Sequence, residues 1–206
     1  FGWDVHKAIV DNLHVATRDE CHPCFALPAY MQRGIDRGHL GRKTRDKGGF
    51  FRVEGKGADA VTFVLDPATG DYRPLAEVQP PMPTFVERMK HEIRSGKHPE
   101  AFDVLCSTDG RDAKLLRRVV LGYISYALGR VGEVVEQAKD VDRIMGFGFN
   151  WAPPSVLVDA IGAARTIDLL DREGLMVPPV LAEAAIAGVP LYADTHDSAR
   201  FFTVAA

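Results

Sequence analysis

The sequence predicts a mostly α-helical protein with a small β-hairpin, built from two related helical lobes. The first observation is a segment plan that occurs twice: a glycine, a helix, a proline-initiated helix ending at glycine, a polar turn and a Phe-Phe strand. The first copy runs from Phe1-Gly2 to Gly49–Val53, and the second from Ile161-Gly162 to Arg200–Val204. The second observation is helical spacing of apolar residues over much of the chain. Two copies indicate a duplicated lobe rather than a solenoid, which needs three or more short repeats.

The first lobe is predicted to span residues 1–83. Asp4 is placed to cap its first helix, and Pro28 begins a second helix that ends at Gly34 or Gly38. The predicted elements are helices 4–16 and 28–38 and strands Phe50–Val53 and Val61–Leu65. This copy lacks the segment that precedes Ile161 in the second copy, so we expect the lobe to be N-terminally truncated.

The second lobe is predicted to span residues 84–206. Thr84-Phe85-Val86-Glu87 has the pattern of a capping box, and Asp112 is placed to cap the longest helix of the chain. The predicted helices are 84–95, 112–139, 141–145, 155–161, 163–173 and 179–187, with a loop at 101–111. The long helix carries a wide apolar stripe: Leu116, Val119, Val120, Tyr123, Ala127, Leu128, Val131, Val134 and Val135. We therefore expect this helix at the centre of the packed lobes.

Composition excludes several classes of protein. Of 206 residues, 46% are apolar and 26% charged, which are ordinary values for a globular protein. The net charge of −3 gives no reason to expect binding to nucleic acid or to an anionic membrane. No apolar run approaches the roughly 18 residues of a membrane span. Three cysteines argue against a disulfide scaffold and for the reducing cytoplasm.

Cys21-His22-Pro23-Cys24 is the segment with the most evident chemistry. Two cysteines at this spacing can share a metal ion or cycle as a dithiol. A structural zinc site needs four ligands, and no second pair follows at the required spacing. A redox pair opens a helix directly after a strand, whereas this pair follows a predicted helix. We therefore expect two unpaired loop cysteines.

Motifs for cofactor binding and catalysis are missing from the sequence. No Gly-x-Gly-x-x-Gly follows a strand, and no P-loop, Gly-x-Ser-x-Gly or His-Glu-x-x-His occurs. We assign no catalytic, cofactor-binding or metal-binding residue in this chain. One turn, Arg42-Lys43-Thr44, can contact a phosphate or carboxylate of a ligand, or it is a solvated turn before a strand. The aromatic set Phe147, Phe149 and Trp151 indicates core or subunit-interface packing rather than a ligand site.

The order of these segments resembles the C-terminal, mostly helical region of bacterial or archaeal 3-hydroxyacyl-CoA dehydrogenases. The family has an Asp-Ile-Asp-x-Ala-Met segment, matched by Asp140–Met145, and a closing Gly-Lys-Lys-Thr-Gly-x-Gly-Phe-Tyr, matched in part by Gly41–Thr44 and Gly48–Phe51. The resemblance implies duplicated helical lobes of the 6-phosphogluconate-dehydrogenase C-terminal-like type. The family asparagine that approaches the substrate is replaced by Arg117, so the second lobe resembles a degenerate copy.

The resemblance implies an enzyme of fatty-acid β-oxidation that oxidises L-3-hydroxyacyl-CoA to 3-ketoacyl-CoA with NAD. The catalytic histidine and glutamate of that family lie in an NAD-binding domain, which we expect to be missing here, so the fragment alone is predicted to be inactive. It would cover the acyl-CoA cleft, with Arg42, Lys43 and Thr44 as substrate-binding candidates, and form a homo-oligomer. A fused enoyl-CoA hydratase domain is a further candidate partner. The alternatives are a non-catalytic helical interaction module and, less favoured, a Cys-x-x-Cys redox or zinc protein.

Overall fold

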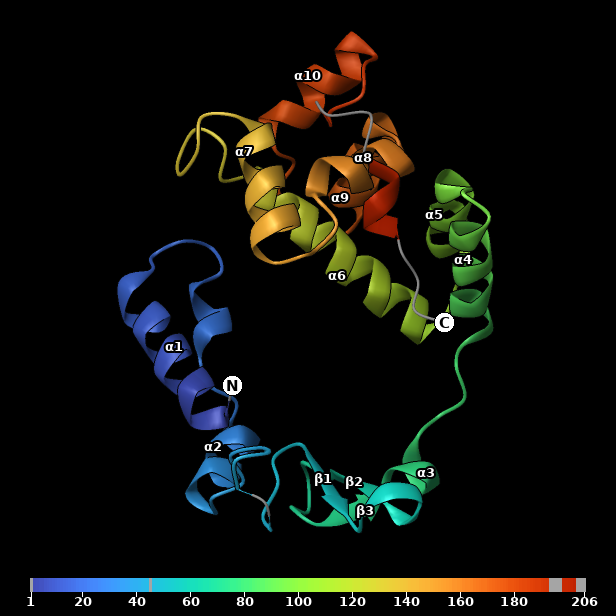
Figure 1. The fold of residues 1–206 in the computed structure, drawn as a ribbon. Helices are drawn as coiled ribbons and strands as arrows, with labels where there is room; N and C mark the ends of the chain where they lie inside the picture. The colour runs from blue at the N-terminus through green and yellow to red at the C-terminus, as the bar shows by residue number, and fades with distance from the viewer. Residues whose placement is uncertain (1, 45, 193–197, 203–206) are drawn as a thin grey trace. The chain divides into compact units, whose positions relative to one another are not determined.

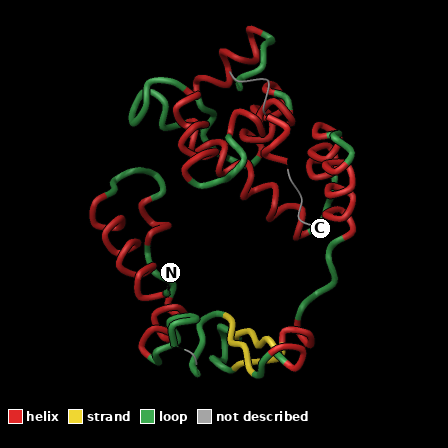
Figure 2. The backbone as a smooth tube through the Cα atoms, in the orientation of Figure 1, coloured by secondary structure: helices red, strands yellow, loops and turns green. Residues whose placement is uncertain are grey.

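The chain divides into two compact units, Phe1–Pro81 and Met82–Ala206. The structure is a computed structural model that describes residues 2–44, 46–192 and 198–202. Helices dominate, and the strands form one short sheet in the first unit (Figure 2). The predicted class, mostly helical with a small β element, is confirmed. Within the described ranges, no helix is both long enough and apolar enough to cross a membrane.

The first unit combines three α-helices with a three-stranded antiparallel sheet (Figure 1). Its elements are α1 (Trp3–Ala16), η1 (His22–Phe25), α2 (Ala29–Asp36), β1 (Phe51–Glu54), η2 (Gly57–Asp59), β2 (Val61–Leu65), β3 (Tyr72–Pro74) and α3 (Leu75–Val78). The sheet order is β1-β2-β3, with Phe51 opposite Val64 and Leu65 opposite Tyr72. The prediction of a two-stranded hairpin therefore missed β3, because its three residues are too short to show an alternating pattern.

The two longer helices of the first unit bury few residues. Helix α1 contains no buried residue, and the buried residue of α2 is Gly34. A Cβ at Gly34 would lie 2.3 Å from a ring carbon of Trp3, so the glycine is needed for this close approach. The predicted Asp4 cap is wrong: Gly2 is the N-cap of α1, and Asp4 lies in its first turn.

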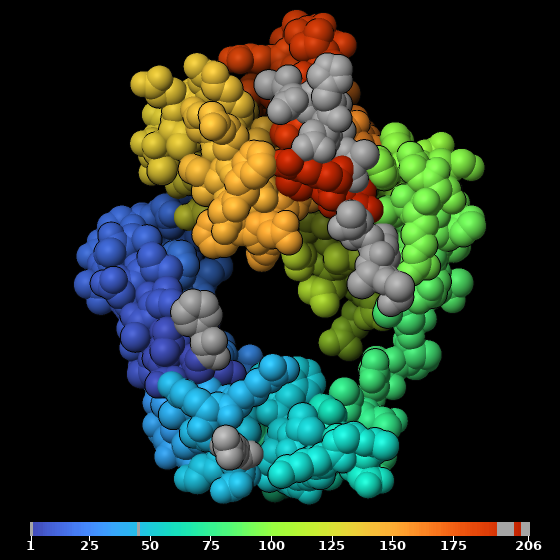
Figure 3. All heavy atoms as spheres, viewed as in Figure 1, coloured from blue at the N-terminus to red at the C-terminus, as the bar shows by residue number. Residues whose placement is uncertain are grey.

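The second unit is a helical bundle around one core. Its elements are α4 (Thr84–Arg94), α5 (His98–Ser107), α6 (Arg111–Leu128), α7 (Ala138–Arg143), the π-helix η3 (Ile144–Gly148), α8 (Pro154–Ile161), α9 (Ala163–Arg172), α10 (Pro179–Ala187) and η4 (Ser198–Phe202). Side chains of α5, α6, α8 and α9 meet in the core, where Leu105, Ile124, Val158 and Leu170 are at most 1% exposed. Helices α4 and α5 pack closely, and the space-filling view shows them as one continuous mass (Figure 3, bright green).

Several predictions about the second unit are wrong. The loop predicted at 101–111 is mostly helix α5, whose buried face includes Phe102 and Leu105. The long helix ends at Leu128 rather than Lys139, because the chain turns at Gly129 and takes a left-handed conformation at Gly132 (φ +87°). The expected capping box at Thr84 does not form, because Pro83 is the N-cap.

The second copy of the segment plan also departs from the first at its end. Residues Ser198–Phe202 form a 3₁₀-helix, where a Phe-Phe strand was predicted. Aromatic residues favour strands only where a neighbouring strand supplies hydrogen bonds, and the described part of the second unit contains no such strand. Of the same repeat, Asp194, Thr195, Thr203 and Val204 lie outside the described residues.

Candidate functional site

The basic turn singled out in the sequence lies between Gly41 and Gly48, which are hydrogen-bonded to each other in the first unit. The Thr44 hydroxyl lies 2.9 Å from the carbonyl oxygens of both Gly41 and Gly48, to which it can donate, and it accepts the Leu40 N–H at 3.2 Å. The Gly41 N–H also donates to the Gly48 carbonyl at 2.7 Å. A Cβ at Gly49 would lie 2.7 Å from Gly41 Cα, so the two ends of the loop touch through their backbones. The Thr44 hydroxyl is thus used inside the loop, and its contact with substrate stays a prediction.

Helix α1 is attached to this loop by two contacts. The Trp3 N–H donates to the Leu40 carbonyl at 3.1 Å, and Lys43 Nζ donates to Asp4 Oδ2 at 2.5 Å. The hydrogen bond from Lys43 lowers the pKa of the Asp4 carboxyl, which favours its charged form and hence the ion pair. The Lys43 ammonium is therefore already paired with a carboxylate.

Strand β3 also contacts this loop, through Tyr72. The Tyr72 hydroxyl lies 2.5 Å from the Gly49 carbonyl and 2.9 Å from the Lys47 carbonyl, and it donates its one proton between them. Burial raises the pKa of Tyr72, which keeps this donor protonated. No sequence pattern indicated this role, because Tyr72 was identified only as the residue after a turn.

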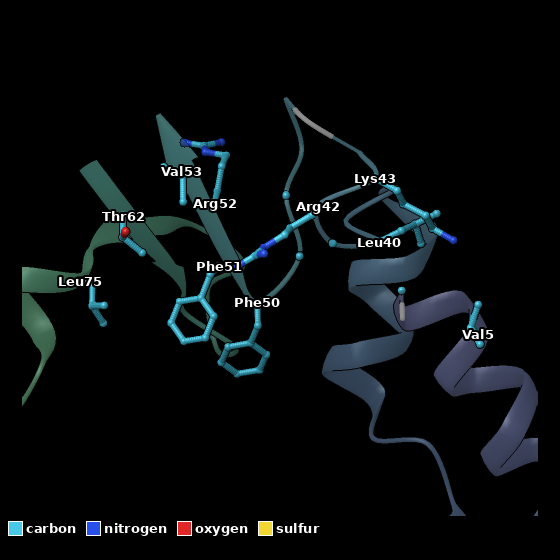
Figure 4. Close-up of a pocket in the computed structure, with 14 residues that line it drawn as sticks. Val5, Leu40, Arg42, Lys43, Phe50, Phe51, Arg52, Val53, Thr62 and Leu75 are labelled. Atoms are coloured by element: carbon cyan, nitrogen blue, oxygen red, sulfur yellow. The ribbon is translucent and has the colours of Figure 1, made fainter. Parts of the chain in front are cut away.

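These elements enclose a groove with a volume of about 1290 Å³, which we call the β1 groove. It is lined by Gly2, Val5, Leu40, Gly41, Arg42, Lys43, Gly48, Gly49, Phe50, Phe51, Arg52, Val53, Thr62 and Leu75. Two of the three predicted substrate-binding residues, Arg42 and Lys43, therefore line one groove (Figure 4). Arg45, the next basic residue along the turn, lies outside the described residues.

Strand β1 and Phe50, which precedes it, contribute residues to the groove that were not among the predicted site residues. Phe50 packs edge-on against Trp3, with ring centroids 5.7 Å apart, and its neighbour Phe51 is 54% exposed. Arg52 pairs with Glu54 at 2.7 Å, and its guanidinium lies 4.3 Å from the Tyr72 ring centroid. An arginine between apolar strand residues was the one signal that could have identified this position.

The Cys21-x-x-Cys24 pair lies in and just before η1, away from any strand. Cys21 is half-buried and Cys24 exposed, and both are free thiols. Burial raises the pKa of Cys21, which opposes the thiolate that redox chemistry and metal binding require. Within the described ranges, no three His, Cys, Asp or Glu side chains are grouped to hold a metal ion.

Arg117, the residue at the position of the family asparagine, has a structural role in the second unit. Its guanidinium donates to the carbonyl oxygens of Leu105 at 3.0 Å and Thr108 at 3.2 Å. These carbonyls belong to the C-terminal end of α5, where backbone acceptors have no helical partner. Arg117 therefore joins α6 to α5 and is turned away from solvent, with 12% of its side chain exposed.

The aromatic set of the second unit lies at the surface. Phe147, Phe149 and Trp151 are 66%, 63% and 58% exposed, so the core alternative is wrong for all three. Trp151 contacts Tyr123 edge-on at 5.6 Å, and Arg200 lies 4.4 Å from the Phe147 ring centroid. The subunit-interface alternative stays a prediction.

Comparison with known proteins gives one distant relative. A probable 3-hydroxyacyl-CoA dehydrogenase of Bacillus subtilis (strain 168) is 24% identical to this chain over 183 residues, which is 88% of the chain. The chain spans about a fifth (22%) of the length of that protein. No family model matches the chain. No solved structure matches it either.

Proposed function

We propose that this chain is part of the C-terminal helical region of an NAD-dependent 3-hydroxyacyl-CoA dehydrogenase. The observation that carries the proposal is the alignment to the Bacillus subtilis protein, which covers 88% of this chain at 24% identity. The mostly helical fold with a small sheet agrees with the C-terminal region that the sequence resembles. The whole enzyme would act in the cytoplasm in fatty-acid β-oxidation, converting L-3-hydroxyacyl-CoA to 3-ketoacyl-CoA.

NAD binding is proposed for the whole enzyme rather than for residues of this chain. A dinucleotide fold needs parallel strands joined by helices, with a glycine-rich turn after the first strand. The sheet of the first unit is antiparallel and has three short strands, and the Gly55-Lys56-Gly57 turn after β1 leads through η2 into the antiparallel strand β2 instead of into a long helix. These residues do not fit the dinucleotide, so we derive no hydride-transfer step from them.

The role proposed for the chain itself is to cover the acyl-CoA cleft and to mediate subunit contacts in a homo-oligomer. In the first unit, Arg42 and Lys43 carry positive charge into the β1 groove, where an anionic substrate can be bound. In the second unit, the exposed aromatic side chains provide a candidate contact surface. A fused enoyl-CoA hydratase domain is proposed as a further partner of the whole enzyme.

The test is an assay of NADH formation from L-3-hydroxyacyl-CoA thioesters. The full-length protein that contains this chain should reduce NAD with the L-isomer and not with the D-isomer. The 206-residue chain alone should give no turnover. A full-length protein without L-3-hydroxyacyl-CoA activity at any chain length, or turnover by the chain alone, would contradict the proposal.

A second candidate, a non-catalytic helical interaction module, is favoured by the exposure of Phe147, Phe149 and Trp151. A module of this kind would bind a protein partner and leave NADH formation in the full-length protein unaffected when the aromatics are replaced.

A further inference from the structure

The β1 groove combines positive charge with an exposed apolar wall. All of its ionisable lining residues are cations: Arg42, Lys43 and Arg52. Beside them, Phe51 and Val53 are 54% and 58% exposed. Its volume of about 1290 Å³ exceeds the roughly 300–1000 Å³ of ordinary small-molecule sites. The lining therefore suits a large ligand that has both an anionic and an apolar part.

The three cations differ in whether they already have a carboxylate or aromatic partner. Arg52 is held by Glu54 and by the ring of Tyr72. Lys43 is paired with Asp4 at 2.5 Å. Arg42 has no recorded hydrogen bond or ion pair with any described residue, and its side chain extends toward Phe51, whereas Lys43 points toward α1 (Figure 4). Arg42 is therefore the cation in this groove that an incoming anion can contact without breaking a pair.

We propose that the β1 groove binds a phosphorylated ligand with an apolar arm, whose phosphate contacts Arg42 and whose arm lies against Phe51 and Val53. A guanidinium presents paired N–H donors that match two phosphate oxygens, which favours phosphate over a single point contact. The choice of an acyl-CoA as the natural ligand rests on the proposed function; the phosphate and apolar chemistry rests on the groove.

Asp4 competes with the ligand for Lys43. The Lys43–Asp4 pair is solvent-accessible, with side chains 47% and 41% exposed, so its net stabilisation is small and screened by salt. In the structure the Lys43 ammonium points toward α1, away from the Arg42 side chain, so Lys43 contacts the ligand only when Asp4 releases it (Figure 4). Removing the Asp4 charge should therefore free Lys43 and tighten binding, an outcome that a purely structural role of the ion pair would not produce.

Trp3 provides the measurement, because its ring lies against Phe50 in the groove wall. In a Trp151→Phe background, Trp3 is the chain's one remaining tryptophan, so its fluorescence reports on this groove. The probes are dodecanoyl-CoA, CoA, inorganic pyrophosphate and dodecanoate. Dodecanoyl-CoA should bind at least tenfold more tightly than CoA, pyrophosphate or dodecanoate alone.

Substitutions then separate the contribution of the phosphate contact to ligand affinity from that of the apolar wall. Arg42→Gln should weaken CoA and dodecanoyl-CoA about tenfold, which corresponds to about 1.4 kcal/mol. Phe51→Ser should weaken dodecanoyl-CoA and leave CoA unchanged, and Asp4→Asn should tighten both. Lys56→Gln is the matched control, because Lys56 is an exposed cation of the same unit outside the groove lining, and it should change nothing. Circular dichroism of each variant checks that it is folded.

Two results would overturn the inference. One is CoA affinity that Arg42→Gln does not alter; the other is dodecanoate binding as tightly as dodecanoyl-CoA, which would mean a fatty-acid site without phosphate recognition. The proposed function is tested separately. If the full-length protein has dehydrogenase activity and Arg42→Gln leaves its KM unchanged, the ligand site in the β1 groove is rejected and the proposed function stands. If the ligand binds in the β1 groove but the full-length protein lacks that activity, the proposed function is rejected and the ligand site stands.

Discussion

At the residue scale, Asp142 is the carboxylate whose charge is least compatible with its surroundings. It is 3% exposed at the packed side of α7, and its Oδ1 accepts the Ser155 N–H at 3.0 Å, near the start of α8. Burial raises the pKa of Asp142 to about 6, against the lowering effect of the Ser155 hydrogen bond. The desolvation cost therefore exceeds the favourable position of an anion at a helix N-terminus.

The raised pKa predicts that the second unit becomes more stable as the pH falls. A carboxyl with a folded pKa near 6 and an ordinary value of 3.8 favours folding when protonated, fully below pH 3.8, and this stabilisation is lost as pH rises through 6. Asp142→Asn keeps the acceptor for Ser155 without the charge. At pH 7.5 it should be more stable than the parent by about 2–3 kcal/mol in urea unfolding, and the difference should shrink toward pH 4.

Asp168→Asn is the control for this experiment, because Asp168 is an exposed aspartate on α9 of the same unit. Because it is exposed, its replacement should change the stability at pH 7.5 by no more than about 0.5 kcal/mol. Equal stability of Asp142→Asn and the parent at both pH values would show that the buried carboxyl is solvated in solution.

At the element scale, α6 packs against α5, α7, α8 and α9 through a face that only partly matches the apolar pattern: Leu128 was on the predicted stripe and is 1% exposed. Leu121 and Ile124 are 1% and 0% exposed, whereas Val119 is 60% exposed. Val120, on the predicted stripe, lies at the half-buried edge of the core. The predicted stripe was therefore shifted around the helix: it included Val119 on the solvent side and left out Leu121 and Ile124 on the core side.

Charge substitutions on α6 should separate the two faces. Leu121→Asp should destabilise the second unit by several kcal/mol, because it buries an unpaired charge among apolar side chains. Val119→Asp, two residues away and exposed, should stay within about 0.5 kcal/mol of the parent, and Val120→Asp should lie between them. Thermal unfolding measures all three. A melting temperature of Leu121→Asp equal to that of Val119→Asp would show that α6 is peripheral.

Elements were predictable where a single residue fixes the backbone. Pro179 and Gly188 bound α10 as predicted, since proline suits the first turn and Gly188 takes φ +65° after the last. Strand β2 has its predicted bounds for a similar reason: a β-branched and aromatic run ends at a polar turn. Helix α5 was missed because its ends are polar. The helices that pack against it, α4 and α8, are brought together with it only by the tertiary fold, which no local sequence pattern indicates.

The candidate site was predictable only in part, for the same reason. The basic turn was evident as a cluster of adjacent charges in the sequence. The contacts that shape the β1 groove join Asp4 to Lys43 and Tyr72 to Gly49, across 39 and 23 residues. No local sequence pattern indicates such pairs. The structure was therefore needed to tell which cation is already paired and which is available to a ligand.

At the scale of the whole molecule, the second unit exposes three large aromatic side chains, Phe147, Phe149 and Trp151. Phe147 and Phe149 lie on and just after the π-helix η3, and both are more than 60% exposed. Aromatic side chains are enriched at subunit interfaces, where they bury a large area at little cost in side-chain entropy. The proposed homo-oligomer therefore has a candidate contact surface on this side of the unit.

Replacing Phe149 tests that surface directly. Phe149→Asp should shift the protein from oligomer to monomer in sedimentation velocity at micromolar concentration, because a charge at a closed interface is desolvated without a partner. The melting temperature of a monomeric second unit should fall only by the lost oligomer stabilisation, since Phe149 is 63% exposed in the single chain. Ile186→Asp is the matched control, because Ile186 is 88% exposed on α10 and should leave the mass unchanged. A parent that is already monomeric, or a Phe149→Asp variant of unchanged oligomeric mass, would show that these aromatics do not join subunits.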